Sequence, residues 1–411
     1  MKVFKFGGAS VKDAGGVRNL AEIVCEQGQQ AVIVVSAMGK TTNALERIVR
    51  AYMDQKTDDI SHELRELRAY HDGIIRELPG DFVAVYQTFN DLEALLIQPP
   101  ASSYDETYDR VVSLGEITST QIVAAYLTQI DIPTRWVDAR LLVRTDATFR
   151  EGRVDWDETT RRISEATSDK DVTVTQGFIG QAPDGRTTTL GREGSDYTAA
   201  IFAHCLNAES VTIWKDVPGV LNADPKWFDD TVLLEKLTYQ DTIELAYYGA
   251  TVIHPKTIKP LQNKGIPLYV RSFVQPHAPG TMIGNFDRYL SMPSFIFKID
   301  QILISLHPND FSFIAEDNLS RIFGQFAQTG VKINLMQNTA ISFSVVVDND
   351  LNRVPALLEQ LQQDFRVSYN DGLELITIRY YDQATIDRVL VDKKLLLEQK
   401  SRHTVQLVVR P

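Results

Sequence analysis

The residues nearest the start of the chain form the first pattern that could do chemistry. Lys5 ends a short β-prone segment, and Gly7 and Gly8 follow within three residues. Two successive glycines allow backbone N–H groups to approach an anion closely, and the lysine adds a positive charge, so the pattern suits a phosphoryl group. An ordinary strand-to-helix turn with a surface lysine would have the same residues, and this segment by itself favours neither interpretation.

A second pattern lies between Gly191 and Thr198. Arg192 offers the planar fork that pairs with a carboxylate. Ser195 opens a predicted helix, and helix N-termini attract anions. Asp196 lies in the first turn of that helix, where it either caps the helix or acts as a functional carboxylate. Considered alone, capping is the better interpretation of Asp196.

Three further segments combine charged residues with loops or helix starts. The segment Trp214–Gly219 ends a buried strand in a polar loop, and open α/β sheets bind ligands at such carboxyl ends. Glu116 lies near a helix start, where it could bind an ammonium group or merely cap the helix. Lys256 follows His254 and a proline, and it could reach a phosphate or remain solvated.

One segment imitates a known motif without matching it. Gly39, Lys40 and Thr41 resemble the end of a P-loop, but that motif needs a further glycine five positions earlier, where this chain has valine. The chain contains no HExxH or GxGxxG motif. Its two cysteines, Cys25 and Cys205, are too far apart in sequence for a CxxC metal or redox motif.

The composition limits the class of protein. The 411 residues carry a formal net charge of −12, with 44% hydrophobic and 23% charged residues. These fractions are typical of soluble globular proteins, and an acidic chain is poorly suited to holding nucleic acid or an anionic membrane through bulk charge. No signal-peptide stretch or long apolar run occurs, and cysteine is scarce. We therefore expect a cytoplasmic protein with no nucleic-acid or membrane partner.

The elements that would position these residues follow the order of a parallel α/β domain. Residues 3–6 and the apolar run 31–35 predict strands, with helical spacing between them, which indicates a βαβ unit. Residues 43–130 predict an almost wholly helical insertion. Strands are predicted again near 134–137, 172–176, 211–215 and 268–271, so we expect a large α/β sheet domain over residues 1–290.

The remainder of the chain, residues 295–411, changes character. Its candidate strands and helices suggest the order βαββαβ, the ferredoxin-like theme of small-molecule sensing modules. We expect more than one such unit here but less than two. The strand candidates are 302–306, 341–347, 366–369, 373–380 and 404–409, and the helix candidates are 318–328, 354–363 and 384–399.

In their order and spacing, these segments together resemble the aspartokinases, a family with the amino-acid kinase fold and C-terminal ACT modules. The resemblance covers residues 1–290, and the tail resembles the ACT modules of the same family. The matching segments are Lys5–Ser10, Val34–Ala37 with Thr42-Asn43, Ser113–Glu116, Gln176–Phe178, Gly191–Ala200, Trp214–Gly219 with Asp224-Pro225, Glu244-Leu245 with Gly249-Ala250, and His254–Thr257.

The resemblance implies transfer of the γ-phosphoryl group of ATP, bound with Mg²⁺, to the β-carboxylate of L-aspartate. The products would be ADP and 4-phospho-L-aspartate, in the first step of lysine, threonine and methionine biosynthesis. Lys5 would neutralise the transferring group, and Asp196 would position the charged groups around it. Such positioning and charge neutralisation do most of the work in phosphoryl transfer, and the nucleophile is already a carboxylate.

The resemblance also implies the binding residues. Aspartate would contact Glu116 through its ammonium group and Arg192 through a carboxylate, with Thr42 and Ser195 in support. An amino-acid effector would bind near Asp317 and Asn318 in the tail, paired ACT modules imply a homodimer, and no protein ligand to a metal is assigned. The nucleotide site would contain Lys5, Gly7, Gly8, Lys215, Asp216, Leu221, Asp224, Lys226 and Lys256.

Three positions depart from the pattern of the family. Glu193 stands where members commonly have glycine, Lys215 where many have threonine, and Leu221 where many have a tyrosine against the adenine. The tail is also shorter than the usual pair of ACT modules, and no second catalytic domain follows it, so we expect a monofunctional enzyme.

Two alternatives to an aspartate kinase are another amino-acid kinase, such as glutamate 5-kinase or acetylglutamate kinase, and a non-catalytic amino-acid sensor. The Lys5–Ser10 segment, with Glu116 and Arg192, argues against the other kinases. Retention of both Lys5 and Asp196 argues against the sensor.

Overall fold

The computed structural model describes residues 1–27, 30–101, 103–167, 171–250, 253–287, 292–310 and 312–411. The chain forms two compact units. The N-terminal unit contains Met1–Val220, Leu233–Ala246 and Thr251–Tyr289, and the C-terminal unit contains Leu221–Val232, Tyr247–Ala250 and Leu290–Pro411. The domain boundary that the sequence predicts near residue 290 falls outside the described residues.

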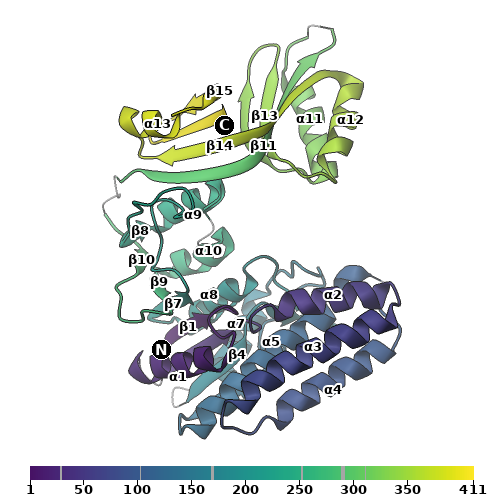
Figure 1. The fold of residues 1–411 in the computed structure, drawn as a ribbon, viewed down its shortest axis with the longest axis vertical. Helices are drawn as coiled ribbons and strands as arrows, with labels where there is room; N and C mark the ends of the chain where they lie inside the picture. Colours follow the sequence, from purple (N-terminus) through teal and green to yellow (C-terminus); the bar gives the residue numbers. More distant parts are fainter. Residues whose placement is uncertain (28–29, 102, 168–170, 251–252, 288–291, 311) are drawn as a thin grey trace. The chain divides into compact units, whose positions relative to one another are not determined.

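An eight-stranded sheet in the order β3-β4-β2-β1-β7-β9-β10-β8 forms the centre of the N-terminal unit (Figure 1). Neighbouring strands are parallel except for β9 with β10, so the prediction of a mostly parallel α/β sheet is confirmed. β5 (Ile179–Gln181) and β6 (Thr187–Thr189) form a separate small hairpin. The strands of the large sheet are β1 (Lys2–Phe6), β2 (Ala31–Val35), β3 (Thr134–Val137), β4 (Val172–Gln176), β7 (Ser210–Lys215), β8 (Lys236–Thr238), β9 (Leu268–Ser272) and β10 (Thr281–Gly284).

Strand β1 shows how this sheet positions the functional side chains. Parallel pairing on both sides fixes its register, with Lys5 opposite Val34 of β2 and Ile213 of β7. Because side chains alternate along a strand, Phe4 and Phe6 enter the large apolar core, while Lys5 points to the other face. A buried cation is costly unless it is paired, so the placement of Lys5 indicates a charged site on that face.

A helical insertion separates β2 from β3. Its helices are α2 (Thr41–Met53), α3 (Thr57–Arg76), α4 (Val83–Ile97) and α5 (Tyr104–Gln129), and they lie side by side in Figure 1. The amphipathic stripes of α3 and α4 are buried against the core, as their sequence predicts. α5 is buried along most of its length because it contacts both the other helices and the sheet.

Helix α8 covers the face of the sheet toward which Lys5 points. It contacts β1, β2 and β7 and packs between α7 and α10.

No described helix is both long and apolar enough to span a membrane. The remaining helices before the C-terminal sheet are α1 (Ala14–Gln27), α6 (Ala139–Leu142), α7 (Trp156–Ala166), α8 (Gly194–Leu206), α9 (Tyr239–Tyr248) and α10 (Pro255–Lys264).

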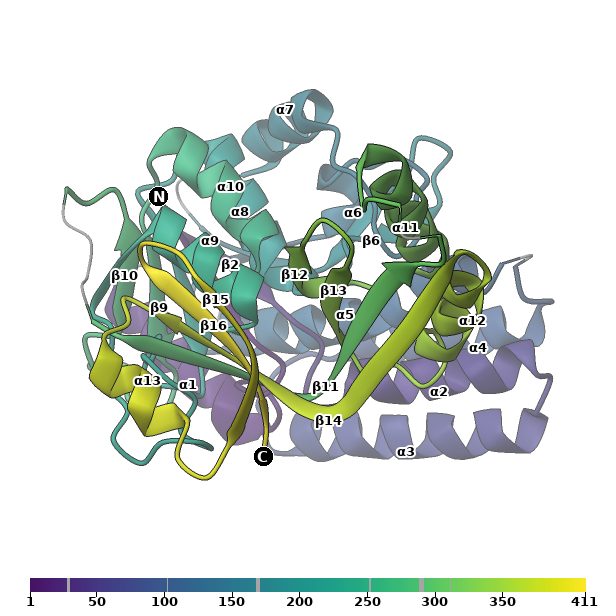
Figure 2. The ribbon, with the colours of Figure 1, turned by 90° about the horizontal axis from the view of Figure 1, so that it is seen from above.

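A six-stranded antiparallel sheet in the order β12-β13-β11-β14-β16-β15 forms the C-terminal unit (Figure 2). Its strands are β11 (Ser294–Pro308), β12 (Ile333–Asn338), β13 (Phe343–Asp348), β14 (Phe365–Arg379), β15 (Lys394–Lys400) and β16 (Thr404–Arg410). Its helices are α11 (Glu316–Thr329), α12 (Val354–Asp364) and α13 (Gln383–Val389).

Two ferredoxin-like units share the two longest strands of this sheet. The second half of β11, with α11, β12, β13, α12 and the first half of β14, forms one complete βαββαβ unit. The other halves of β11 and β14 combine with α13, β15 and β16 into a second unit. Among the described residues after β11, α13 is the one helix of this second unit. The expectation that the tail is shorter than the usual pair of modules stays a prediction.

A segment from earlier in the chain packs onto this second unit. Within Leu221–Val232, the ring of Phe228 lies 4.9 Å from the ring of Phe295 on β11. Arg388 of α13 lies over Phe228, with its guanidinium carbon 4.5 Å from the ring centre, and pairs with Asp230 at 2.6 Å. The loop that follows β7 and precedes β8 therefore contributes part of the C-terminal unit.

Two predictions for the tail are wrong. The sequence predicts two strands broken at Asn370–Gly372, but β14 runs through that turn-like segment because β11 pairs with it on both sides, with register shifts between Lys298 and Leu303. The predicted helix 384–399 ends at Val389, and Lys394–Lys400 forms the edge strand β15, paired with β16. In both cases pairing with a distant strand overrides the local pattern. The prediction also omits β12.

Candidate active site

A buried cluster of three charged side chains lies between β1, β7 and α8. The ammonium group of Lys5 is 2.7 Å from Oδ1 of Asp196, and that of Lys215 is 3.5 Å from Oδ2. The Asp196 side chain is 3% exposed, and that of Lys5 is 10% exposed. The sheet thus brings together one carboxylate and two cations that are far apart in the sequence.

The charge balance of this cluster keeps Asp196 ionised. Burial alone would raise the pKa of Asp196, but the charges of Lys5 and Lys215 and their hydrogen bonds outweigh burial and hold that pKa below its ordinary value. In this cluster two ammonium groups face one carboxylate. Such a site can bind an anion, for example a phosphoryl group, which would pair with the ammonium groups beside Asp196.

The start of α8 has an unusual backbone. Glu193 precedes the helix with φ of 53° and ψ of 30°, the left-handed region that favours glycine. Its Oε2 atom is buried and has no hydrogen-bond partner among the described residues. Ser195 is buried at the first turn, where Gly177 approaches so closely that a Cβ atom there would lie 2.4 Å from Cβ of Ser195. Glu193 stands where aspartokinases commonly have glycine, and the left-handed backbone at this position is one that glycine adopts most easily.

The two glycines after β1 belong to a pair of joined loops. Ser10 and Val11 donate backbone hydrogen bonds to the carbonyl of Gly7, and Gly39 donates to the carbonyl of Gly8 at 2.9 Å. A Cβ atom on Gly8 would lie 2.2 Å from the carbonyl oxygen of Ala37, so only glycine fits this approach. The loop after β1 and the loop after β2 are thus held against each other at the carboxyl ends of their strands.

Glu116 reaches the second of these loops from the middle of α5. It is 3% exposed, and one carboxylate oxygen accepts a 2.9 Å hydrogen bond from the backbone N–H of Ala37. Burial raises the pKa of Glu116 to about 8, against the hydrogen bond from Ala37 and the charge of Lys5. A carboxyl group in this state can bind a cation by losing its proton. The prediction that Glu116 lies near a helix start is wrong, because it lies in the middle of α5, and this position removes the alternative that it caps a helix.

The other residues predicted for the N-terminal unit surround these groups. Thr42 is half-buried in the first turn of α2, and Arg192 is exposed just before α8. Lys256 is the second residue of α10, and its ammonium group lies 3.7 Å from the place where a Cβ of Gly191 would be. The Gly191–Asp196 segment and the start of α10 are therefore neighbours. Asp216 is exposed in the loop after β7.

Three residues predicted for the nucleotide site belong to the C-terminal unit. Leu221, Asp224 and Lys226 lie in the segment that packs with β11 and α13, so the structure does not group them with Lys5 and Asp196. The carboxylate of Asp224 accepts a hydrogen bond from the backbone N–H of Lys226 at 2.9 Å and so forms a local turn. Their assignment to a nucleotide pocket stays a prediction.

A second candidate site lies in the C-terminal unit at the start of α11. A pocket of about 500 Å³ is lined by Asp317 and Asn318, the two residues predicted to contact an effector. The amide of Asn318 donates to the carbonyl of Phe313 at 2.8 Å, which ties the helix start to the preceding loop. Its other charged lining residues are Asp310, Arg321 and Asp364.

One buried carboxylate of the N-terminal unit is not indicated by any sequence pattern. Asp109 on α5 is fully buried and accepts hydrogen bonds from the backbone N–H groups of Arg150 and Thr189 and from the Thr189 hydroxyl. Burial raises its pKa to about 6, and these hydrogen bonds oppose the shift. Its partners are all within the fold, so Asp109 acts as a structural anchor for the hairpin that precedes Gly191.

Comparison with known proteins identifies the relatives of this chain. Residues 1–272 match the model of the amino acid kinase family. The chain is 30% identical to lysine-sensitive aspartokinase 3 of Escherichia coli, over 92% of this chain and 86% of that protein. It is 32% identical to the chloroplastic aspartokinase 1 of Arabidopsis thaliana, over 84% of this chain and 63% of that protein.

A solved structure matches the whole chain. The E. coli aspartokinase III in complex with aspartate and ADP, in its R-state, superposes with a TM-score of 0.84 and 26% identity, covering 100% of this chain and 96% of that one. The same enzyme in complex with lysine and aspartate, in its T-state, gives a TM-score of 0.83. The likeness therefore extends through both the sheet domain and the C-terminal unit.

The buried charge cluster generates a prediction about stability. We expect Asp196→Asn to lower the free energy of unfolding by about 3 kcal/mol or more near neutral pH, because the buried Lys5 loses the carboxylate beside it and Lys215 loses one of its contacts. A carboxylate with a lowered folded-state pKa stabilises the fold above its unfolded pKa, and that stability is lost as pH falls through the folded value. The difference from the wild type should thus be constant from about pH 7 to pH 5 and shrink below about pH 4.

Thermal or urea unfolding at several pH values measures this difference. Asp157→Asn, at an exposed carboxylate of α7, is the matched control and should show little change at any pH. A wild type and an Asp196→Asn variant of equal stability near neutral pH would show that the cluster is not the ionised triad described above.

Proposed function

The chain belongs to the amino acid kinase family and, within it, to the aspartokinases, and we propose that it transfers the γ-phosphoryl group of ATP to the β-carboxylate of L-aspartate. In this reaction an oxygen of the β-carboxylate forms a bond to the γ-phosphorus while the bond from that phosphorus to the bridging oxygen breaks. ADP leaves with the electron pair of that bond. The observation that carries the proposal is the buried cluster of Lys5, Asp196 and Lys215.

The chain's own residues divide into two groups in this proposal. Lys5 and Lys215 neutralise the charge of the transferring group, and Asp196 holds both ammonium groups in place. Glu116 and Arg192 orient aspartate by its ammonium group and α-carboxylate, with Thr42 and Ser195 beside them. Because the nucleophile is a carboxylate that is ionised at neutral pH, no general base is needed.

The nucleotide phosphates would lie at the loop after β1, which contains Gly7 and Gly8. Lys256, in the first turn of α10, and Asp216, in the loop after β7, would contribute to the same nucleotide site. Among the described residues, no three histidine, cysteine or carboxylate side chains converge on a point that could hold a metal. We propose that Mg²⁺ binds together with the nucleotide, where it would share the negative charge of the phosphates with the lysines.

Two further properties belong to the proposal. Cys25 and Cys205 are both free thiols, which suits the reduced cytoplasm. A homodimer formed through the C-terminal units would suit the exposed apolar side chains of their sheet, such as Met336 on β12 and Leu395 on β15.

The test of this function is an assay of the full chain with MgATP and one acceptor at a time. We expect ADP release with aspartate, and trapping of the product by hydroxylamine as a hydroxamate, but neither signal with glutamate or without an acceptor. Glutamate as the better acceptor would indicate a different amino-acid kinase, and no turnover with any acceptor would favour a sensor.

Lys5→Ala should lose most of kcat while the KM for aspartate stays within a few-fold, since the charge of Lys5 acts mainly in the transition state.

The raised pKa of Glu116 generates a prediction about pH. An aspartate ammonium group pairs with the ionised carboxylate, so binding should release a proton and strengthen as pH rises toward the Glu116 pKa of about 8. We expect the KM for aspartate to fall between about pH 6 and pH 8 and then level off, while the KM for ATP changes little. Steady-state kinetics across this range measures both constants.

Two variants make this test specific. Glu116→Gln should raise the KM for aspartate and remove its dependence on pH. Asp109→Asn removes the other carboxyl of α5 with a raised pKa, and it should leave the slope between about pH 7 and pH 8 intact because Asp109 titrates near 6. The same slope in Glu116→Gln as in the wild type would contradict the assignment.

The pocket at the start of α11 generates a prediction about regulation. Its lining contains three carboxylates and one arginine, so we propose that it binds lysine, whose cationic side chain suits the surplus of acid, in preference to threonine. Millimolar lysine should then inhibit turnover and raise the melting temperature, because an effector must favour one state of the protein. Titration of lysine, threonine and both together, followed by turnover and thermal unfolding, measures the effect.

A matched pair of variants completes the design. Asp317→Asn should weaken the response to lysine, whereas Asp371→Asn, at an exposed carboxylate of β14 outside the pocket, should leave it unchanged. No change in turnover or melting temperature with either amino acid would leave the C-terminal unit as an assembly module.

A further inference from the structure

Two consecutive residues of α3 reach the two loops of the candidate active site. Tyr70 and His71 lie in α3 of the helical insertion, and none of the sequence motifs includes this helix. Their side chains point in different directions, one to the loop that follows β1 and the other to the start of α2. The helix therefore contacts both loops from outside the sheet.

Tyr70 contacts the ends of both loops. Its hydroxyl donates a 2.6 Å hydrogen bond to the carbonyl of Lys12, in the loop that begins with Gly7. The same hydroxyl lies against Gly39, which has φ of 55°, and a Cβ atom there would come within 2.4 Å of the Tyr70 oxygen. The tyrosine is half-buried, and burial raises its pKa to about 12, so the hydroxyl remains a donor throughout the working range of pH.

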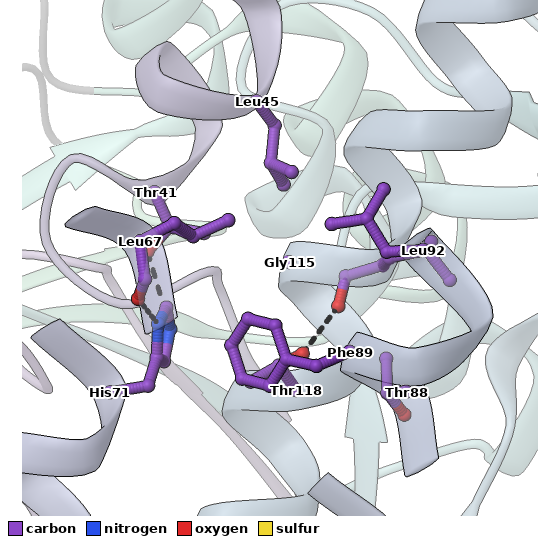
Figure 3. Close-up of a pocket in the computed structure, with 10 residues that line it drawn as sticks. Thr41, Leu45, Leu67, His71, Thr88, Phe89, Leu92, Gly115 and Thr118 are labelled. Atoms are coloured by element: carbon purple, nitrogen blue, oxygen red, sulfur yellow. Dashed lines mark hydrogen bonds between the residues drawn. The ribbon is translucent and has the colours of Figure 1, made fainter. Parts of the chain in front are cut away.

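His71 contacts the first residue of α2. Its Nε2 atom lies 3.4 Å from the hydroxyl of Thr41, and its Nδ1 atom lies 2.8 Å from the carbonyl of Leu67 (Figure 3). Burial lowers the pKa of His71, so the ring is neutral. A carbonyl can only accept, which places the proton on Nδ1 and makes Nε2 the acceptor for the Thr41 hydroxyl. The ring is 1% exposed and packs edge-on against Tyr70 and Phe89.

The contacts of Thr41 continue to the substrate side of the site. Its methyl group lies against Gly115, where a Cβ atom would come within 2.8 Å, and Gly115 precedes Glu116 in α5. Thr42, the next residue of α2, is the one proposed to support aspartate. A hydrogen bond to Thr41 therefore helps to hold the first turn of α2, which carries Thr42, against the turn of α5 that carries Glu116.

We propose that Tyr70 and His71 are positioning residues for the reaction: Tyr70 holds the nucleotide loop, and His71 holds the aspartate side. This inference rests on the proposed function, because that function gives the two loops their separate substrates. Neither residue touches a reacting atom; each acts through Lys12 or Thr41. Both come from the insertion, which thereby has a role in catalysis beyond its own packing.

Two variants separate the positions. Tyr70→Phe keeps the ring and removes the hydroxyl, so the fold is retained while the bond to Lys12 is lost. A hydrogen bond of this kind is worth a factor of about two to ten. We expect the KM for ATP to rise and kcat to fall within that range, with the KM for aspartate unchanged. Tyr86→Phe, on α4 of the same insertion, is the control and should match the wild type.

The two nitrogens of His71 can be tested separately with amides. His71→Gln places a polar atom near the position of Nε2 and can still bond Thr41, whereas His71→Asn reaches only the position of Nδ1. We expect the KM for aspartate to rise about two- to tenfold in His71→Asn, to stay near the wild-type value in His71→Gln, and kcat to change little in either. His62→Asn, at an exposed histidine of α3, is the control.

The outcomes distinguish this inference from a purely structural role. Equal effects of His71→Asn and His71→Gln, or a Tyr70→Phe variant that matches Tyr86→Phe, would overturn it. Melting temperatures of all variants show whether a loss comes from unfolding instead. If the wild type proves inactive with every acceptor, the proposed function fails by itself. Calorimetry of ATP and aspartate binding then tests the positions, with Tyr70→Phe expected to weaken ATP and His71→Asn to weaken aspartate.

Discussion

The placement of a charged lysine inside a parallel sheet is the constraint on which the site depends. Lys5 lies on a strand that is buried on both faces, and its charge is tolerated because Asp196 lies 2.7 Å away on the helix that covers that face. The carboxylate in turn requires its cations, since burial alone would protonate it. Each group is therefore stable only in the presence of the others, and the sheet order that places β7 beside β1 supplies the second cation, Lys215.

The remaining features of the N-terminal unit build outward from this cluster. The loops after β1 and β2 meet at Gly8 and Ala37, where the approach is so close that only glycine fits. Glu116 reaches the same place from α5 through the N–H of Ala37, so one backbone group joins the acceptor side to the nucleotide side. The insertion then holds both loops through Tyr70 and His71. The site is thus assembled from the carboxyl ends of strands, the starts of α2, α8 and α10, and the insertion helices α3 and α5.

Much of this arrangement could be predicted from the sequence, and the exceptions have physical causes. The buried strands and amphipathic helices of the N-terminal unit have strong local patterns, so their prediction is confirmed. The strand β15 and the continuous β14 depend on partners far away in the chain, and a local pattern such as Asn370–Gly372 indicates a turn that the pairing suppresses. Among the site residues, Lys5 and Asp196 follow from motifs. Tertiary packing determines the pairing of Lys215 with Asp196 and the roles of Tyr70 and His71. A local sequence motif does not predict such packing.

The central claim is that this cluster directs the γ-phosphoryl group to one particular carboxylate of aspartate. Isotope labelling with ¹⁸O tests it most directly, because the nucleophilic oxygen becomes the bridging oxygen of the product and shifts the ³¹P resonance of the acyl phosphate. We expect a shifted resonance when ¹⁸O is placed in the β-carboxylate and none when it is placed in the α-carboxylate. A shift from the α-label, or no acyl phosphate resonance with either label, would contradict it.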